Sequence, residues 1–277
     1  MKINNKIIIA LTFLLTIVSL SSCNQQKIKI KDYENHDKVT YEYGSNEIKD
    51  FMENNQGDFV IEHYQEEEYN YMKNKRNARQ VNKSLEVYSF DATTNTILVD
   101  YSWDSFEKNM DNYSPFTLGK KTVSTSGSYQ CLIFKNKATN YYFYLNEYRY
   151  SKTSDNLEIS ELAKKEVNSY IKNNWVEAVQ YGINSLYKKD NIYTYLFEYY
   201  KTQGNIDKEK IGEQVIQLTI EEDFITIVRE ENTFQKGGTN DNPIYVKHNI
   251  TEFVKITTKE VNNEKYNKHT DKIKDNL

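Results

Sequence analysis

Apolar and polar residues alternate along most of this chain, and apolar residues at helical spacing interrupt the alternation in two places. A period of two is typical of half-buried strands, whereas apolar residues three and four positions apart indicate one face of a helix. The helical spacing occurs at 45–55 and 155–174. The alternating segments predict strands at 59–64, 85–91, 96–102, 129–134, 141–148, 176–187, 192–201, 214–220, 224–230 and 244–258. Residues 66–80 fit neither pattern, because their charges favour a helix and their tyrosines favour a strand.

Short polar turns at 92–95, 136–140 and 188–191 join several of these strands and predict β-hairpins. The order of elements is a helix followed by strands, and it occurs twice. This order predicts an α+β fold in which antiparallel sheets each pack on a helix. It resembles cystatin-like and NTF2-like domains, and the resemblance implies two tandem domains over 44–152 and 153–259.

The first residues of the chain have a different pattern from the rest. Lys2 and Lys6 are followed by an apolar run over 7–20, which is shorter than the roughly 20 residues that a permanent membrane-spanning helix needs. The run ends in Leu20-Ser21-Ser22-Cys23. A positive start, a short apolar run and small residues predict a signal peptide over 1–22.

The tetrapeptide that ends at Cys23 resembles the lipobox of bacterial lipoproteins. The resemblance implies that Cys23 carries a diacylglyceryl group, with palmitate-type acyl chains, and anchors the protein to the cell membrane on the side facing away from the cytoplasm. Two acyl chains are enough for stable anchoring. We then expect a flexible tether over 23–43 and a disordered tail over 260–277, because both segments are polar and have little periodicity.

The composition limits the partners that the protein can have. The chain has 36 basic and 40 acidic residues and a pI near 5.7, which argues against nucleic-acid binding. It has two cysteines, and lipidation of Cys23 would leave Cys131 without an intramolecular partner. Cys131 lies in a predicted strand among apolar residues, so we expect a buried structural thiol.

Candidate catalytic and metal-binding groups are sparse. His63 precedes Glu66, Glu67 and Glu68, and these side chains could hold a cation if a turn brought them together, but a solvated charge run is the stronger interpretation. No spacing of a hydrolase, phosphate loop or zinc site is present in the sequence. We therefore predict no catalytic residues, no metal, no cofactor and no enzymatic activity.

The aromatic residues are the most unusual feature of the chain, which contains 24 tyrosines. Tyr193, Tyr195, Phe197 and Tyr199 would share one face of a strand. Such a row could stack on sugars or line an apolar groove, but we expect it to pack on the second helix as core. These observations favour a lipid-anchored binding or interaction module. The alternatives are a carrier or sensor of an apolar or lipidic ligand, and a cell-envelope enzyme whose carboxylates the sequence does not single out.

Overall fold

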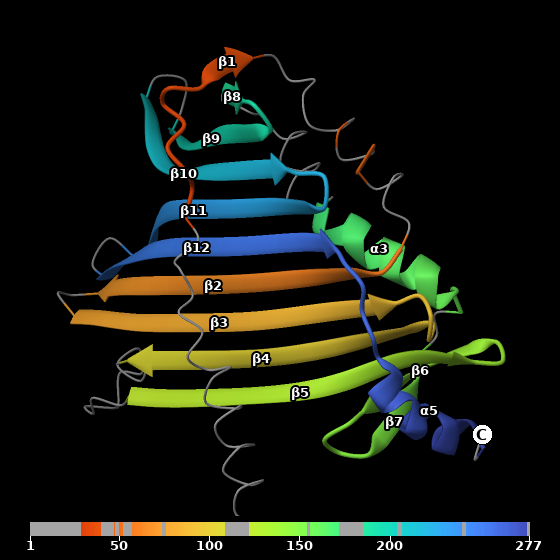
Figure 1. Cartoon of the computed structure of the whole chain (residues 1–277). Coiled ribbons are helices and arrows are strands. Elements are labelled where there is room, and N and C mark those ends of the chain that lie inside the picture. Colours follow the sequence, from red (N-terminus) through yellow and green to blue (C-terminus); the bar gives the residue numbers. More distant parts are fainter. Residues whose placement is uncertain are drawn as a thin grey trace, which may run out of the picture.

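The protein folds around one large antiparallel sheet (Figure 1). The computed structural model describes residues 29–39, 47, 50–51, 57–73, 76–108, 122–153, 156–171, 185–203, 207–239 and 242–275. The strands are β1 Asp37–Val39, β2 Phe59–Lys73, β3 Arg76–Asp91, β4 Thr96–Lys108, β5 Thr122–Asn136, β6 Thr139–Tyr144, β7 Arg149–Lys152, β8 Ser185–Lys189, β9 Ile192–Gln203, β10 Asp207–Ile220, β11 Phe224–Thr239 and β12 Asn242–Thr258. Their order in the sheet is β1-β8-β9-β10-β11-β12-β2-β3-β4-β5-β6-β7, and all neighbouring pairs of these described strands are antiparallel.

Tight turns connect most neighbouring strands, as the sequence predicts. Asn95 between β3 and β4, Lys137 between β5 and β6, and Asp190 between β8 and β9 all have positive φ angles, near 51 to 53°. Asn and Asp tolerate this left-handed backbone better than most residues do, which is why they suit hairpin turns. The predicted hairpins at these positions are confirmed.

The pairing of β2 with β12 joins the two ends of the meander. It runs from Phe59 opposite Thr258 to Lys73 opposite Ile244, so strands of both predicted domains belong to one sheet. The prediction of an α+β fold with two tandem cystatin-like or NTF2-like domains is therefore wrong. The order of elements is compatible with that architecture, but no local sequence pattern predicts the long-range pairing of β2 with β12.

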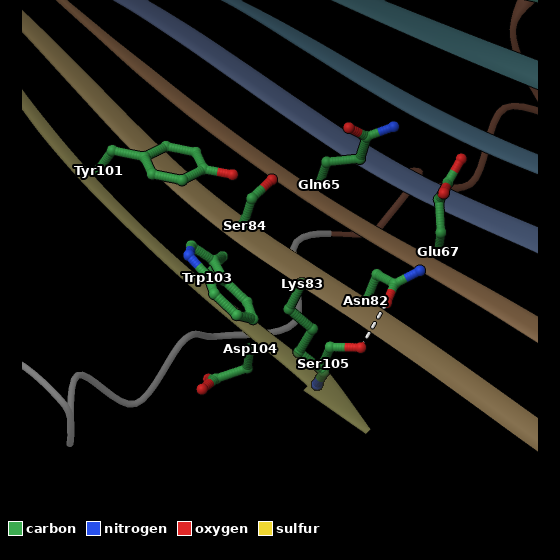
Figure 2. A pocket seen from close by; sticks show the side chains of 9 residues that line it. All are labelled: Gln65, Glu67, Asn82, Lys83, Ser84, Tyr101, Trp103, Asp104 and Ser105. Carbon is green, nitrogen blue, oxygen red and sulfur yellow. Dashed lines mark hydrogen bonds between the residues drawn. The ribbon is translucent and has the colours of Figure 1, made fainter. Parts of the chain in front are cut away.

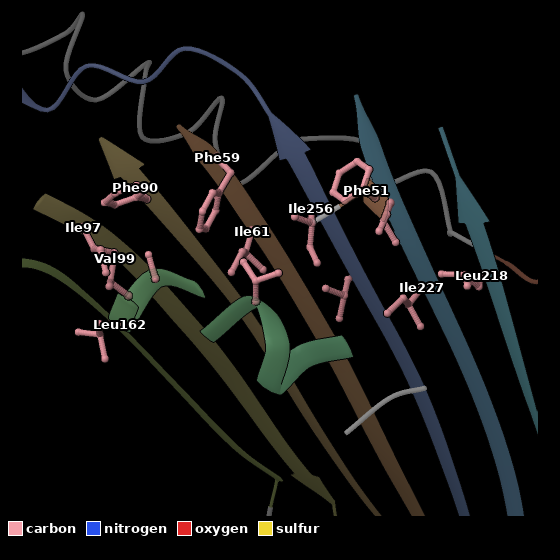
Figure 3. Close-up of a cluster of buried hydrophobic side chains, with 14 of the residues drawn as sticks. Phe51, Phe59, Ile61, Phe90, Ile97, Val99, Leu162, Leu218, Ile227 and Ile256 are labelled. Carbon is pink, nitrogen blue, oxygen red and sulfur yellow. The ribbon is translucent and has the colours of Figure 1, made fainter. Parts of the chain in front are cut away.

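One face of the sheet carries helix α3, Ile159–Ile171, and we call it the helix face (Figure 1). Apolar side chains of α3, including Leu162 and Val167, pack in the same cluster as Ile61, Val99 and Ile227 from the strands (Figure 3). Full burial of one aliphatic side chain contributes about 1.5–3 kcal/mol. The predicted second helix is thus confirmed as a packing element. Most of the first predicted helix, 45–55, lies outside the described residues.

The opposite face carries chain that the sequence predicts to be flexible. Helix α5, Asn267–Lys274, follows the 3-10 turn η3, Glu264–Tyr266, and its Ile273 packs against Phe134, Tyr141 and Phe143. The turn η3 and helix α5 together occupy most of the predicted disordered tail, because Ile273 packs on an aromatic surface that local sequence does not reveal. In the predicted tether, Lys31 exchanges hydrogen bonds with Gln217, and β1 pairs with β8.

Most strands continue well beyond the apolar core. In β4 the burial changes along the strand: Thr96 to Val99 are buried, and most of the following residues are partly or fully exposed. Residues 66–80, left open by the sequence, form the second half of β2 and the start of β3. The helix face thus has an apolar half under α3 and a polar half that no described helix covers.

Candidate binding groove on the helix face

Side chains of three neighbouring strands form rows across the polar half of the helix face. The register places Trp103 of β4 opposite Ser84 of β3, and Ser84 opposite Gln65 of β2. One step further from the core, Ser105 lies opposite Asn82, which lies opposite Glu67. Because paired residues of neighbouring strands point to the same side, these groups gather on one surface (Figure 2).

These rows line a shallow groove of about 220 Å³. Its lining residues are Gln65, Glu67, Asn82, Lys83, Ser84, Tyr101, Trp103, Asp104 and Ser105. Lys83 and Asp104 alternate with the others along their strands, so their side chains belong to the opposite face. Lys83 Nζ lies 3.1 Å from Glu66 Oε2 there. The groove itself therefore presents two aromatic rings, two amides, two serine hydroxyls, the hydroxyl of Tyr101 and one carboxylate.

Trp103 is the largest exposed group in the groove, with 38% of its surface accessible. Its indole lies against Gly127, the residue directly opposite on β5. A Cβ atom at Gly127 would come within 2.6 Å of Trp103 Nε1 and 2.9 Å of Cε2. The ring can lie this close to the neighbouring strand only because residue 127 has no side chain.

The polar groups beside Trp103 are partly organised by contacts with each other. Ser105 donates a hydrogen bond of 2.8 Å from its Oγ to Asn82 Oδ1, and this bond orients the Asn82 amide group toward the groove surface (Figure 2). Tyr101 lies on the same strand two residues before Trp103, and its ring centroid is 5.2 Å from that of Tyr129. The surface therefore combines fixed aromatic and amide groups with solvent access.

An ion-pair network borders the groove on the side of β12 and β11. His63 Nε2 lies 2.8 Å from Glu252 Oε1, and Arg229 donates to Glu252 Oε2 at 3.1 Å and to Glu231 Oε2 at 2.7 Å. Burial alone would raise the pKa of the Glu252 carboxyl, but the hydrogen bond and charge of His63, together with Arg229, hold that pKa below its usual value. The network is thus a rigid charged border, with its groups directed at each other.

A second histidine lies near the end of the groove. The His248 ring stacks on Tyr69 with a centroid distance of 4.2 Å, and its Nε2 is 3.8 Å from Glu67 Oε1. That distance is too long for a hydrogen bond, and the buried Nε2 atom has no hydrogen-bond partner. From the residues that the structure describes, Glu67 therefore receives a single long hydrogen bond of 3.5 Å, from the Tyr69 hydroxyl, and its carboxylate is available to the groove.

The structure separates the residues that sequence reasoning placed together. Strand alternation puts Glu67 on the helix face with His63 and turns Glu66 and Glu68 to the opposite face. Across the described ranges, no group of three His, Cys, Asp or Glu side chains is arranged to hold a metal ion. The groove was not predicted, although its signal is present in the sequence as the alternation Tyr101, Trp103 and Ser105.

The buried residues behave as the sequence predicts. Cys131 is 2% exposed, and burial raises the pKa of its thiol to about 12, so it is protonated near neutral pH. Tyr193, Tyr195 and Phe197 are at most 6% exposed and belong to the cluster that contains Leu162 and Val167. The prediction of core is confirmed for these three residues, whereas Tyr199, the last of the predicted row, is only partly buried and lies outside the cluster. Cys23 lies outside the described residues, so its modification stays a prediction.

Comparison with known proteins identifies no relative by sequence. No protein-family model matches the chain, and no curated protein matches it. Neisserial surface protein A is 6% identical over 73% of this chain and 99% of its own, with a TM-score of 0.21. Ail, the attachment invasion locus protein of Yersinia pestis, is 4% identical over 72% and 99%, with a TM-score of 0.17. The translocator domain of autotransporter NalP from Neisseria meningitidis is 7% identical over 75% and 93%, with a TM-score of 0.18.

These three structures are outer-membrane β-barrel proteins and not lipoprotein carriers. The comparisons thus contradict the resemblance to bacterial lipoproteins, and they overturn the interpretation as a lipid-anchored interaction module or ligand carrier. Of the predicted location, only the coarser part, the cell envelope, agrees with these neighbours. Because all three TM-scores are low, we assign neither the fold nor the activity of these proteins to this chain. Within the described part of the chain, no helix is long and apolar enough to cross a membrane.

Proposed function

We propose that the protein binds a saccharide in the groove across β2, β3 and β4. The observation that carries this proposal is the exposed Trp103 ring, which occupies the space over Gly127 with amides, hydroxyls and a carboxylate beside it. A pyranose ring has one face of C–H groups, which stacks on an aromatic ring, and a rim of hydroxyls, which need donors and acceptors. Trp and Tyr supply apolar area with a polar handle, and amides and carboxylates supply the hydrogen bonds.

The charge of the groove narrows the class of sugar. Glu67 is the charged side chain that the groove presents on the helix face, since Lys83 and Asp104 alternate to the other side. A carboxylate accepts strong hydrogen bonds from hydroxyls or ammonium groups and repels anions. We therefore expect neutral sugars or amino sugars with a flat apolar face, such as β-linked glucose or N-acetylglucosamine units, and weak binding of acidic sugars.

The location that goes with this proposal is the cell envelope. It is supported by the positive start and the apolar run over 7–20, which resemble an export signal. A protein in that compartment would have access to the polysaccharides of the envelope as ligands. Attachment to the membrane through a lipid on Cys23 is not part of this proposal.

The proposal is tested by measuring binding to a panel of neutral, amino and acidic oligosaccharides with the intact protein. We expect Trp103→Ala to weaken binding about ten-fold or more, because truncating a central aromatic anchor commonly costs at least about 2 kcal/mol. Trp103→Phe should keep part of the affinity. Phe234→Ala is the matched control, because Phe234 is similarly exposed, at 45%, and lies outside the groove.

Tryptophan fluorescence gives an independent readout. The chain has two tryptophans, so a Trp175→Phe variant reports on Trp103 alone. A bound sugar should change the emission of that variant, because stacking removes water from the indole. Equal binding by Trp103→Ala and the unchanged protein would show that Trp103 only covers Gly127, and the proposal would then be abandoned.

A further inference from the structure

A second cavity, separate from the groove, lies between α3 and the strands under it. It has a volume of about 100 Å³. This is well above the roughly 10–15 Å³ that one water molecule needs, so a ligand group of several heavy atoms can enter. Its lining residues are Tyr88, Val99, Tyr129, Cys131, Ile133, Tyr142, Tyr144, Leu162 and Glu166.

Tyrosines dominate this lining. Four strand tyrosines, from β3, β5 and β6, line a space that is otherwise closed by aliphatic side chains and an inert thiol. The rings of Tyr129 and Tyr144 meet edge to face at 5.9 Å, and Tyr129 is 37% exposed, so the cavity is open to solvent on that side. The faces of aromatic rings attract cations, and clusters of such rings recognise methylated ammonium groups.

One of these rings already holds a cation. The guanidinium carbon of Arg149 lies 4.8 Å from the centroid of the Tyr144 ring. Arg149 is the residue paired with Tyr144 across β6 and β7, and its side chain is 64% exposed. No basic side chain is among the residues that line the cavity itself.

A carboxylate closes the cavity from the helix side. Glu166 follows Leu162 by one turn of α3, so both side chains face the strands. Burial, and then the charge of nearby Glu86, raise the pKa of the Glu166 carboxyl. Glu86 accepts hydrogen bonds from the hydroxyls of Tyr88 at 2.9 Å and Tyr170 at 3.1 Å. These hydroxyls are neutral, so they do not cancel the negative charge of Glu86.

We propose that this cavity binds a small organic cation, a methylated ammonium group held by the tyrosine rings and the Glu166 carboxylate. The size of the cavity and its four tyrosine rings favour a trimethylammonium group over a primary amine, because ring faces attract a cation that has no N–H to donate. A cation there would also relieve the repulsion between Glu86 and Glu166. This inference does not rest on saccharide binding in the groove.

The test is calorimetric titration of the intact protein with tetramethylammonium and choline. The comparison ligand is 3,3-dimethylbutan-1-ol, which has the shape of choline without its charge. We expect both cations to bind and the neutral alcohol to bind at least about ten-fold more weakly, since the cation–aromatic attraction adds to the carboxylate charge. Equal binding of choline and the alcohol, or no binding of either cation, would overturn the inference.

Two variants separate the site from general charge effects. Glu166→Gln should weaken choline binding about ten-fold or more, whereas Glu161→Gln, an exposed acidic position on the same helix, should leave it unchanged. Trp103→Ala should also leave it unchanged, which distinguishes this site from the groove. If Glu166→Gln binds choline as well as the unchanged protein does, the assignment to this cavity is wrong.

A choline group can come from a free metabolite or from a lipid head group. Sedimentation with phosphatidylcholine vesicles distinguishes these sources. Binding of free choline alone supports a soluble ligand, and binding of both supports a cavity that also accepts the lipid head group. Vesicle binding that Glu166→Gln does not reduce would show that lipids contact another surface, and it would count against this site as a lipid receptor.

Discussion

Gly127 shows at the scale of one residue how a missing side chain positions a candidate ligand platform. The Trp103 ring occupies the space that a Cβ atom would need, with contacts of 2.6 Å and 2.9 Å to the position of that atom. Real Cβ atoms do not approach rings so closely, so either the indole or the strand must move. The position of the ring therefore depends on a residue of the neighbouring strand.

Gly127→Ala should tilt the indole away from the sheet. We expect a shifted Trp103 emission in the Trp175→Phe background, a loss of saccharide affinity and a stability cost of about 1–3 kcal/mol from overpacking. Gly57→Ala is the control, because a Cβ atom at Gly57 would have no neighbour within 4 Å. Unchanged emission and affinity in Gly127→Ala would show that the ring position does not depend on this glycine.

At the scale of the elements, an ion-pair network links β2, β12 and β11. Glu252 lies between His63 and Arg229, and these partners hold the pKa of its carboxyl below 4.5 against the effect of burial. A carboxyl whose pKa is lowered by folding stabilises the protein above its unfolded pKa and loses that contribution as the pH falls through its folded value. The network should therefore fail in acid, below about pH 4.5.

Glu252→Gln tests this contribution by denaturant unfolding between pH 7 and pH 3. At pH 7 we expect a cost of about 1–3 kcal/mol, because partly buried Arg229 loses a charged partner. Below about pH 4.5 the variant should lose less stability than the unchanged protein, since it lacks this titrating group. Glu222→Gln, in an exposed turn, is the control and should alter neither value; an equal acid response in Glu252→Gln would contradict the role of the network.

The elements also show where sequence reasoning stopped short. Predicted strands such as 96–102 and 224–230 lie within β4 and β11 but end near the edge of the apolar core. Beyond that edge the strands continue with polar residues, which pair with their neighbours through the backbone. Hydrophobic periodicity reports burial of side chains, whereas ladder hydrogen bonds need no particular side chain, so the polar extensions and their groove were missed.

At the scale of the whole molecule, the β2–β12 pairing makes one sheet from the two halves of the chain. We expect the protein to unfold in a single calorimetric transition, because that ladder lies in the middle of the sheet and the buried cluster spans both halves. Two independent domains over 44–152 and 153–259, as the sequence predicts, would instead give two transitions. Calorimetry therefore distinguishes the two expectations.

Two core variants, one in each half, make this test sharper. Ile97→Ala in β4 and Phe197→Ala in β9 should each cost about 2–5 kcal/mol, and both should lower the same transition. Ile97 is 1% exposed and Phe197 is 6% exposed. Two transitions, each lowered by one variant alone, would show that the halves fold independently in spite of the shared sheet.

Local sequence is enough to predict the features that depend on near neighbours: the hairpin turns at Asn95 and Asp190, the apolar face of α3, and the burial of Cys131 and Tyr195. Each of these follows from spacing or backbone preference within a few residues. The pairing of β2 with β12, the position of Trp103 over Gly127 and the cavity that Glu166 shares with four tyrosines are visible in the folded chain alone. Those contacts join residues far apart in the chain. They form because the strand register places these residues together, and no local pattern specifies that register.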